Sequence, residues 1–318
     1  MPNISTDPAR AAALLRAGRL VAIPTETVYG LAANIFDEAA VRSIFRVKQR
    51  PLFNPLIVHL SAADRVETVA RRVPPTAQRL AAAFWPGPLT LVLKKQPTVP
   101  DLITAGKNTV AVRVPDHPRT LELLAQLPFP LAAPSANPFN RISPTRAAHV
   151  ADYFGDEIPL ILDGGECPRG IESTILGFED ETPVLYRLGS LALEDIEAVA
   201  GPVLVRNQAA QTPDAPGMLK KHYAPRTETR LLDGLAELPP TYAPERTGVI
   251  CFTDAPSTTS FAAVRILSER GDYREAAARL YDTLHELDRL GLDLIVALRF
   301  PDRDLGRTIN DRLERAAS

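Results

Sequence analysis

The sequence predicts an α/β protein of two domains, in which a mixed sheet flanked by helices precedes a smaller α/β domain. The 318 residues exceed the roughly 100–200 of a single domain. Short β-branched runs alternate with helical patterns through residues 1–206. After a polar, proline-containing stretch at 207–230, a β-α-β order returns in residues 231–318.

The first domain is expected to begin with a helix that has Asp7 as its N-cap, Pro8 in its first turn and Gly18 at its end. Strands are expected at Leu20–Pro24, Pro55–Leu60, Leu89–Lys94, Val110–Pro115, Leu131–Ala133, Leu160–Leu162, Ser173–Phe178 and Val184–Leu188. Further helices are expected at Glu38–Val47, Ala63–Arg72, Thr76–Phe84, Arg119–Leu127 and Thr145–Phe154. Their apolar faces should cover the sheet.

The second domain follows a segment in which apolar periodicity lapses, so residues 207–230 are expected to link the two domains. Thr247–Phe252 and Asp293–Ala297 have the pattern of strands, and Tyr273–Leu290 has that of a long helix between them. This order favours a small parallel sheet of Rossmann-like type.

The composition excludes several classes of protein. With 45% hydrophobic and 23% charged residues, the chain is neither disordered nor fibrous. No apolar run is long enough for a membrane span and no signal peptide is evident, so we expect a cytosolic protein. Its two cysteines, Cys167 and Cys251, suggest free thiols, and a net charge of −2 argues against a protein that coats nucleic acid.

The first two polar segments with ligand-binding character follow predicted elements. In the segment Pro24–Leu31, Thr27 is the preferred ligand contact, and a plain turn is the alternative. Pro51 should end the preceding helix, which frees Lys48 and Arg50 to converge beside Asn54 on a polyphosphate. A solvated helix end is the alternative there, and a buried core histidine is the alternative for His59.

Two more segments lie on later strands. Strand alternation places Thr109, Ala111 and Arg113 on one face, where an arginine in an apolar run needs an anion. A carboxylate or phosphate partner is favoured, and a mere salt bridge is the alternative. The small residues around Ala133 let a ligand approach the backbone. Ser135, Asn137 and Ser143 offer hydroxyl and amide groups that could bind such a ligand. A plain proline-rich turn is the alternative. Ser173 and Arg187 add a hydroxyl and a cation near strand ends, where structural roles are equally plausible.

No Walker, Rossmann, GxSxG or HExxH motif is present, so the residues alone predict an anion-binding α/β cleft without a standard ATP motif. In order, however, six blocks resemble the long form of the threonylcarbamoyl-AMP synthase family, which has a YrdC-like catalytic domain, a linker and a C-terminal extension. They are PTETVYGL at 24–31, KQRPLFNPLIVH at 48–59, NTVAVRVP at 108–115, APSAN at 133–137, GIESTI at 170–175 and YRLG at 186–189. APGMLKKHYAPR at 215–226 resembles the family's linker motif, and GRTINDRL at 306–313 its C-terminal ending.

The resemblance implies a role for each matching residue. Lys48 and Arg50, with Ser135 and Asn137, meet the family's KxR and SxN signature, and the two cations would act electrostatically in catalysis. L-threonine would contact Thr27, His59, Arg113, Ala133 and Ser173. ATP would contact Lys48, Arg50, Asn54, Thr109, Ser135, Asn137, Ser143, Arg187 and, from a lid formed by the linker, Tyr223.

The implied reaction joins L-threonine, bicarbonate and ATP into threonylcarbamoyl-AMP and pyrophosphate, for N6-threonylcarbamoyladenosine formation in tRNA. It would use Mg²⁺ with ATP, no metal site of the protein itself, and other proteins that carry the product to tRNA. Direct tRNA contact is possible. The alternatives are an RNA-binding module without turnover and an enzyme that makes carbamoyl-adenylate for another acceptor.

Overall fold

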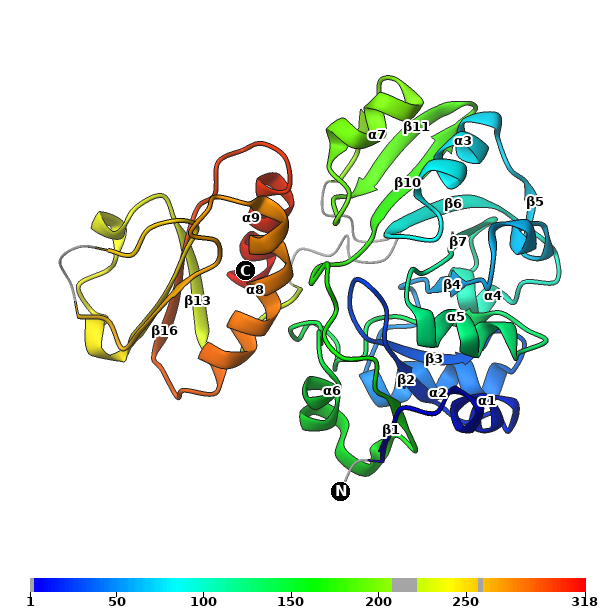
Figure 1. Cartoon of the computed structure of the whole chain (residues 1–318), viewed down its shortest axis with the longest axis horizontal. Coiled ribbons are helices and arrows are strands. Elements are labelled where there is room, and N and C mark those ends of the chain that lie inside the picture. Colours follow the sequence, from blue (N-terminus) through cyan, green and yellow to red (C-terminus); the bar gives the residue numbers. More distant parts are fainter. Residues whose placement is uncertain (1–2, 208–221, 257–259) are drawn as a thin grey trace.

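The computed structural model describes residues 3–207, 222–256 and 260–318. The chain forms a larger N-terminal domain and a smaller C-terminal domain, which lie side by side (Figure 1). The mixed α/β fold class predicted from the sequence is confirmed for both parts. Within the described ranges, no helix is both long and apolar enough to cross a membrane.

The larger domain is built on a 12-stranded sheet with both parallel and antiparallel neighbours, in the order β1-β9-β2-β3-β8-β4-β7-β6-β10-β11-β12, with β5 paired to β6. The strands are β1 (Ile4–Ser5), β2 (Val21–Ile23), β3 (Gly30–Asn34), β4 (Ile57–His59), β5 (Ala70–Arg72), β6 (Leu89–Lys95), β7 (Thr109–Arg113), β8 (Leu131–Ala132), β9 (Ile161–Leu162), β10 (Thr174–Glu179), β11 (Thr182–Arg187) and β12 (Leu204–Val205). All eight strands predicted for this domain are present, with slightly different ends.

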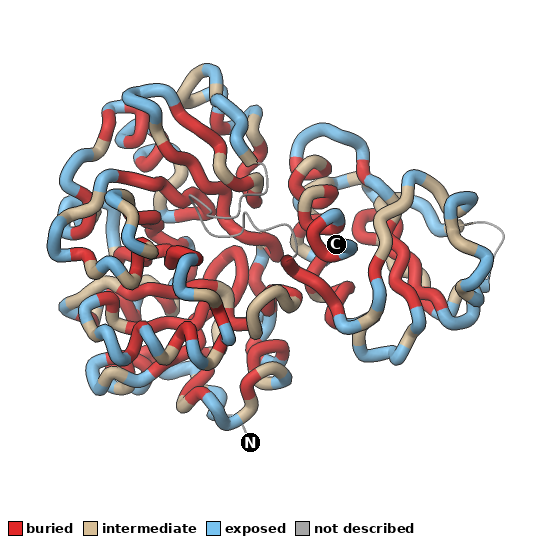
Figure 2. Tube along the Cα trace, turned by 180° about the vertical axis from the view of Figure 1, so that it is seen from behind, coloured by how far each residue is buried: buried red, intermediate tan, exposed pale blue. Residues whose placement is uncertain are grey.

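The helices of this domain cover the sheet as their apolar patterns predicted. They are α1 (Pro8–Arg16), α2 (Glu38–Lys48), α3 (Pro75–Phe84), α4 (Asp101–Thr104), α5 (Pro118–Ala125), α6 (Ala147–Phe154) and α7 (Leu193–Ala200). The side chain of Asp7 caps α1 by accepting from the amide of Ala9 at 2.8 Å, as expected from the Asp-Pro start. Figure 2 shows that the sheet interior is the continuously buried part of this domain.

The helix predicted over Ala63–Arg72 is wrong in its second half. Residues Ala63–Thr68 form a 3₁₀ helix, and Ala70–Arg72 form β5 instead. The spacing of Val66, Val69 and Ala70 suits a helix, but the amide of Gln96 donates to the carbonyl of Val69 at 2.8 Å and so draws this stretch onto β6. Pairing across the sheet overrides the local pattern.

The segment Pro24–Leu31 is the connection of a hairpin, since its last residues enter β3, which pairs antiparallel with β2. The hydroxyl of Thr25 closes this connection by accepting from the amides of Thr27 and Val28 at 3.1 Å each. The strand β3 was not predicted, because its small residues lack a β-branched signal. The hairpin fixes the connection on the sheet near the ends of β4 and β7.

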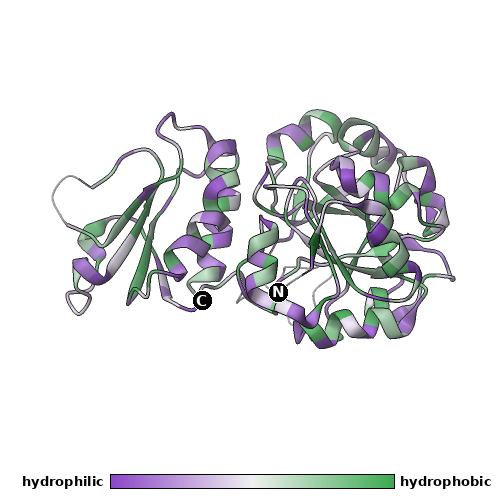
Figure 3. Ribbon diagram, turned by 60° about the horizontal axis from the view of Figure 1, so that its bottom comes forward, coloured by the Kyte–Doolittle hydropathy of each residue, from purple (hydrophilic) through white to green (hydrophobic). Residues whose placement is uncertain are grey.

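The smaller domain has the predicted parallel sheet, in the order β13-β16-β14-β15. Its elements are β13 (Glu228–Leu232), β14 (Thr247–Cys251), β15 (Ala263–Ile266), β16 (Leu294–Leu298), α8 (Tyr273–Asp288) and α9 (Gly306–Ala316). The strands are the most hydrophobic part of this domain (Figure 3). Both helices lie between this sheet and the larger domain, so they form the side that meets it (Figure 1).

Histidines from the two domains stack at their interface. The rings of His149 on α6 and His285 on α8 lie 3.9 Å apart with 20° between their planes. The amide of Thr145 donates to Nδ1 of His149 at 3.3 Å, and Nε2 of His285 donates to the carbonyl of Ser143 at 3.2 Å. Burial lowers the pKa of His149 to about 2 and that of His285 to about 4. Both rings are therefore neutral in the folded protein.

Mild acid is expected to destabilise the protein through this pair. Both folded-state pKa values lie below the ordinary 6.5, so the unfolded chain binds more protons between about pH 6.5 and 4 and stability falls as pH falls through that window. The positive charges of Arg146 and Arg289 oppose protonation of these rings. Asp282, which lies 3.4 Å from His149 Nε2, favours it. We expect a loss of roughly 5 kcal/mol of unfolding free energy over that window, about half of it from each ring.

The measurement is denaturant unfolding at several pH values, with His149→Phe/His285→Phe as the comparison. The double variant keeps two stacked rings but cannot titrate there, and the other histidines titrate equally in both proteins. Its stability should change less steeply with pH than that of the parent. Equal slopes would contradict the assignment to this pair.

Candidate functional site

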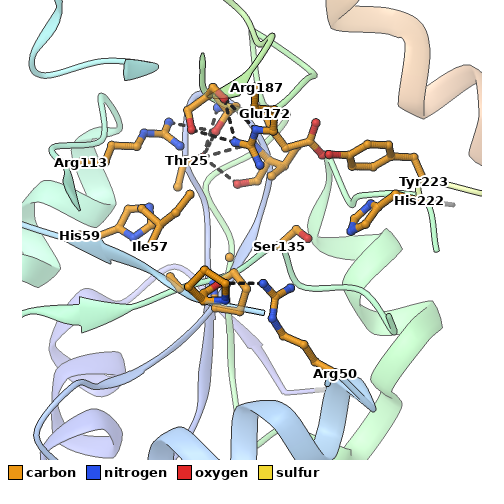
Figure 4. Close-up of a pocket in the computed structure, with 17 residues that line it drawn as sticks. Thr25, Arg50, Ile57, His59, Arg113, Ser135, Glu172, Arg187, His222 and Tyr223 are labelled. Carbon is orange, nitrogen blue, oxygen red and sulfur yellow. Dashed lines mark hydrogen bonds between the residues drawn. The ribbon is translucent and has the colours of Figure 1, made fainter. Parts of the chain in front are cut away.

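A pocket lies where the β2-β3 connection, the ends of β4, β7 and β11, and the residues His222 and Tyr223 meet (Figure 4). Nine of the residues predicted from the sequence line it: Thr27, His59, Arg113, Ala133, Ser173, Arg50, Ser135, Arg187 and Tyr223. His59 and Arg113 lie at one side of the pocket and His222 and Tyr223 at the opposite side, with Ser135 between them (Figure 4). The fold thus gathers residues from seven separate segments of the chain.

Arg113 is positioned by a buried ion pair that the sequence analysis did not identify. Its Nη2 lies 2.7 Å from Oε1 of Glu26 and donates to the hydroxyl of Thr27 at 2.9 Å, and its Nε donates to the carbonyl of Gly87 at 3.2 Å. The second oxygen of Glu26 accepts from the amide of Asp116 at 3.0 Å. The salt bridge to Glu26 is the alternative to an anionic ligand for this strand arginine, but Nη1 has no hydrogen bond to any described residue.

His59 lies beside Arg113, because β4 and β7 run parallel with these two residues in register. Burial and then the charge of Arg113 lower the pKa of His59 to about 3, so the ring is neutral. Its Nδ1 is buried and has no hydrogen-bond partner among the described residues. A buried polar atom without a partner at the wall of a pocket is a candidate ligand contact.

Arg50 enters the other half of the pocket. Its Nε and Nη2 donate to the carbonyls of Asn54 and Pro55 at 3.2 and 2.8 Å, and no carboxylate among the described residues pairs with it. Burial lowers the pKa of the Arg50 guanidinium to about 9, and Arg187 lowers it further while Tyr223 opposes that effect. A buried cation of this kind is suited to an anionic ligand.

Arg187 comes from the end of β11 and faces the same space. It donates from Nη2 to the carbonyl and the hydroxyl of Ser173, at 2.7 and 3.1 Å. Burial lowers the pKa of this guanidinium as well. Burial lowers the pKa of His222 far below its usual range, and the cations Arg50, Lys48, Arg312 and Arg187 lower it further. The nearby positive charge therefore suits a ligand with several negative charges.

Lys48 does not line the pocket. The left-handed residue Gln49 ends α2 one residue after it, and the ammonium group points to the carbonyls of Ser135, at 2.5 Å, and Asn137. Burial lowers the pKa of Lys48, and the charge of Arg50 adds to this. The two cations thus have different positions: Arg50 faces the ligand space, while Lys48 holds the loop that presents Ser135.

Four other predicted residues lie outside the pocket wall. The buried side-chain amide of Asn54 has no partner among the described residues. The side-chain amide of Asn137 donates to the carbonyls of Pro138 and Arg141 at 2.9 Å each. The hydroxyl of Ser143 donates to Glu172 at 2.6 Å. Thr109 begins β7 and lines a separate hollow with Lys94 and Tyr186.

Sequence reasoning missed Glu26, Glu172 and His222 as part of this site. Glu26 stands inside the block at 24–31, and asking which anion pairs with Arg113 could have found it. Glu172 stands in GIESTI, and its partners Tyr281 and Arg312 come from the other domain, at 2.9 Å each. Burial alone would raise the pKa of Glu172, but Arg312 and Arg187 outweigh it, so the carboxylate is ionised.

Comparisons with known proteins cover the whole chain. The family model described as "Telomere recombination", for Sua5, YciO and YrdC proteins, matches residues 13–189, and the model "Threonylcarbamoyl-AMP synthase, C-terminal domain" matches residues 191–318. A threonylcarbamoyl-AMP synthase of Pyrococcus abyssi is 41% identical over 96% of this chain and 93% of its own. One of Bacillus subtilis is 41% identical over 97% and 92%.

The similarity extends to the three-dimensional structure. The crystal structure of P. abyssi Sua5 complexed with L-threonine superposes with a TM-score of 0.91 at 39% identity. The superposition covers 100% of this chain and 97% of that one. Both domains therefore have counterparts in that protein.

Proposed function

Because the chain belongs to the threonylcarbamoyl-AMP synthase family and is a nucleotidyltransferase of tRNA modification, we propose that its pocket binds L-threonine and ATP and joins them with bicarbonate. The observation that carries this proposal is the meeting in one pocket of all five residues expected to bind threonine with Arg50, Ser135, Arg187 and Tyr223. The products are threonylcarbamoyl-AMP and pyrophosphate.

Threonine lies in the half of the pocket formed by Thr27, His59, Arg113, Ala133 and Ser173. Arg113 binds the carboxylate, for which its Nη1 is available, while Glu26 and Thr27 keep the guanidinium in place. Neutral His59 cannot repel the threonine amine, and its unpartnered Nδ1 supports a contact with a polar ligand group. The threonine complex of the P. abyssi protein supports this assignment.

ATP lies in the other half, with its phosphates near Arg50 and Arg187. Arg50 is hydrogen-bonded only to backbone carbonyls among the described residues, which supports an anionic ligand beside it. The lowered pKa values of Arg50 and Arg187 support the same assignment. Ser135, Asn54 and Tyr223 contact the nucleotide directly, and Lys48 and Asn137 shape the loop that bears Ser135. Ser143 contacts ATP from the edge of the site, beside Glu172. A contact with Thr109 requires the nucleotide to extend to the separate hollow that this residue lines.

In the reaction, the threonine amine attacks the carbon of bicarbonate, a C–N bond forms, a C–O bond breaks and water leaves, which gives a carbamate. A carbamate oxygen then attacks the α-phosphorus, the bond to the bridging oxygen breaks, and pyrophosphate leaves with its electron pair. The residues act by positioning the two reactants and by stabilising negative charge, so no covalent protein intermediate is needed. Arg50 and Lys48 supply the electrostatic part of catalysis.

Mg²⁺ would neutralise phosphate charge in this scheme. Among the described residues no group of three His, Cys, Asp or Glu side chains could hold a metal ion. Glu172, which lines the pocket, and Glu26, which lies behind Arg113, are already engaged with arginines. We therefore propose that the ion is held by phosphate oxygens and water and binds together with ATP.

The remaining assignments concern the chain as a whole. We propose residues 1–206 as the catalytic domain, 207–230 as a linker and lid, and 231–318 as the extension domain. Of the lid, residues 208–221 lie outside the described residues, and His222 and Tyr223 line the pocket. The enzyme would act in the cytoplasm and pass its product to the proteins that modify tRNA, with direct tRNA contact also possible.

The proposal is tested by incubating the purified protein with ATP, Mg²⁺, bicarbonate and each amino acid in turn. Pyrophosphate and an adenylated product should form with threonine and bicarbonate together, and not when either is omitted. Product with another acceptor would favour the carbamoyl-adenylate alternative. Tight, salt-sensitive RNA binding without any turnover would favour an RNA-binding module.

Truncating Tyr223 is expected to weaken ATP binding. The backbone of this residue is left-handed, with φ of 64°, and its ring is 1% exposed, so the fold holds it in a conformation that non-glycine residues rarely adopt. Tyr223→Ala should raise the KM for ATP by about tenfold, as for a buried aromatic contact, and change the KM for threonine little.

Tyr223→Phe is the matched control, because the ring stays and only the hydroxyl, which has no partner among the described residues, is lost. We expect it to stay close to the parent enzyme if the ring makes the contact. Unchanged ATP affinity in Tyr223→Ala would remove Tyr223 from the nucleotide site.

A further inference from the structure

The C-terminal domain places a fully buried arginine next to the pocket. Arg312, on α9, donates from Nε to Oε2 of Glu172 at 2.9 Å and from Nη2 to the carbonyl of Leu188 at 2.5 Å. Its third nitrogen pairs with Asp311. The guanidinium carbon also lies 4.9 Å from the centre of the Tyr223 ring, within the range of a cation–π contact.

Tyr281, on α8, reaches the same two residues. Its hydroxyl donates to Oε2 of Glu172 at 2.9 Å, and its ring stacks on Tyr223 with centroids 5.7 Å apart and 28° between the planes. Tyr281 is 0% exposed. Thus Arg312 and Tyr281 together hold one carboxylate and one aromatic ring, and both of those line the pocket.

This contact differs from the other ion pairs between the two domains. Arg289 pairs with Asp152 and Arg146 with Asp282, and all four of these side chains are a third or more exposed. Arg141 and Asp288 form a less exposed pair, at 23% and 13%. None of these residues lines the pocket. Exposed pairs contribute little to stability. Burying a charged pair is costly, so Glu172 and Arg312 are better explained by a need for a fixed geometry than by adhesion between domains.

Glu172, held in place by Arg312 and Tyr281, in turn contacts residues on the nucleotide side of the pocket. Its other oxygen accepts from the hydroxyl of Ser143 at 2.6 Å, and its charge acts on Arg187. Ser143, which is proposed to contact ATP, is therefore oriented by a carboxylate that the C-terminal domain holds, and Arg187 lies within reach of the charge of that carboxylate. Thr27, His59 and Arg113 have no hydrogen bond to Glu172, Tyr281 or Arg312 among the described residues.

Resting on the proposed function, we propose that Arg312 and Tyr281 are positioning residues for ATP: the C-terminal domain completes the nucleotide half of the site by fixing Tyr223 and Glu172. The threonine half is complete within the larger domain. This gives the C-terminal domain a role inside the active site, in place of a separate binding function.

The test measures ATP and threonine binding separately, by calorimetry on the full-length chain. Arg312→Met should weaken ATP binding by about tenfold or more, and Tyr281→Phe, which loses only the hydrogen bond to Glu172, by about threefold. Both should leave threonine binding within about twofold of the parent. Arg312→Lys keeps the charge without the planar fork and should recover part of the loss.

Arg289→Gln is the matched control, because it removes an arginine that joins the two domains away from the pocket. It should change neither affinity. If Arg312 acts through Tyr223, the double variant Arg312→Met/Tyr223→Ala should bind ATP no more weakly than the weaker of its two parent single variants.

The outcomes separate this inference from the proposed function. If the parent protein binds neither ATP nor threonine, the proposed function is wrong. If the parent binds both and Arg312→Met and Tyr281→Phe bind ATP as it does, or lose ATP and threonine equally, the positioning role is wrong. Should Arg312→Met fail to fold, Tyr281→Phe and Arg312→Lys decide the question. In each, the loss of ATP affinity is compared with the loss of threonine affinity.

Discussion

Replacing Arg50 with methionine is expected to lower kcat/KM for ATP by roughly 10²–10³-fold, the usual effect of removing one well-placed donor from a charge-stabilising site. The protein should nevertheless stay folded. Arg50 is a buried cation whose described partners are only the carbonyls of Asn54 and Pro55. The lowered pKa of its guanidinium reflects the cost of that burial.

Methionine fills a similar volume and carries no charge, so the unfolding free energy should be unchanged or rise by about 1 kcal/mol, with the two carbonyls that lose a donor limiting the gain. Arg46→Gln, on the helix α2 that precedes Arg50, is the control, because Arg46 is exposed. Thermal unfolding and pyrophosphate release check both halves of the prediction. A variant that is active, or one that is inactive only because it is unfolded, would contradict it.

Replacing Arg113 with methionine should have two separable effects. Threonine binding is lost, because the carboxylate loses its arginine. In addition, the protein is destabilised by about 3–5 kcal/mol, since Glu26 is left as a buried, unpaired carboxylate. Both side chains of this pair are at most 5% exposed.

The double variant Glu26→Gln/Arg113→Met separates the two effects. With the buried charge removed, most of the lost stability should return, as measured by denaturant unfolding. Threonine-dependent turnover should stay at the level of Arg113→Met. Recovery of turnover in the double variant would exclude Arg113 as the carboxylate ligand.

Much of the fold could be predicted because the strands of the larger domain are short apolar runs between clear turn signals. The exceptions have local physical reasons. Gly30–Asn34 is a strand of small residues, and Ala70–Arg72 is held by β6 against a helical spacing. β3 pairs with the distant β8 as well as with its neighbour β2, and β5 pairs with β6, and no pattern within either segment reports these partners.

The candidate site shows the same division. Alternation along Thr109–Arg113 predicted that Arg113 would need an anion, but the position of Glu26 depends on how the β2-β3 hairpin lies on the sheet. Pro51 predicted the end of a helix, yet the left-handed Gln49 sends Lys48 and Arg50 to different places. The contact of Glu172 with Arg312 depends on the packing of two domains, so neither residue's role was visible in its own segment.

The contacts that build the pocket join residues far apart in sequence: 86 positions separate Thr27 from Arg113, 109 separate Glu172 from Tyr281, and 140 separate Glu172 from Arg312. Contacts of such long range form slowly and late, because each must close a large loop before it contributes. During refolding, catalytic activity should therefore return after the helices and strands have formed and the two domains have docked. The pocket is a sensitive reporter of complete folding.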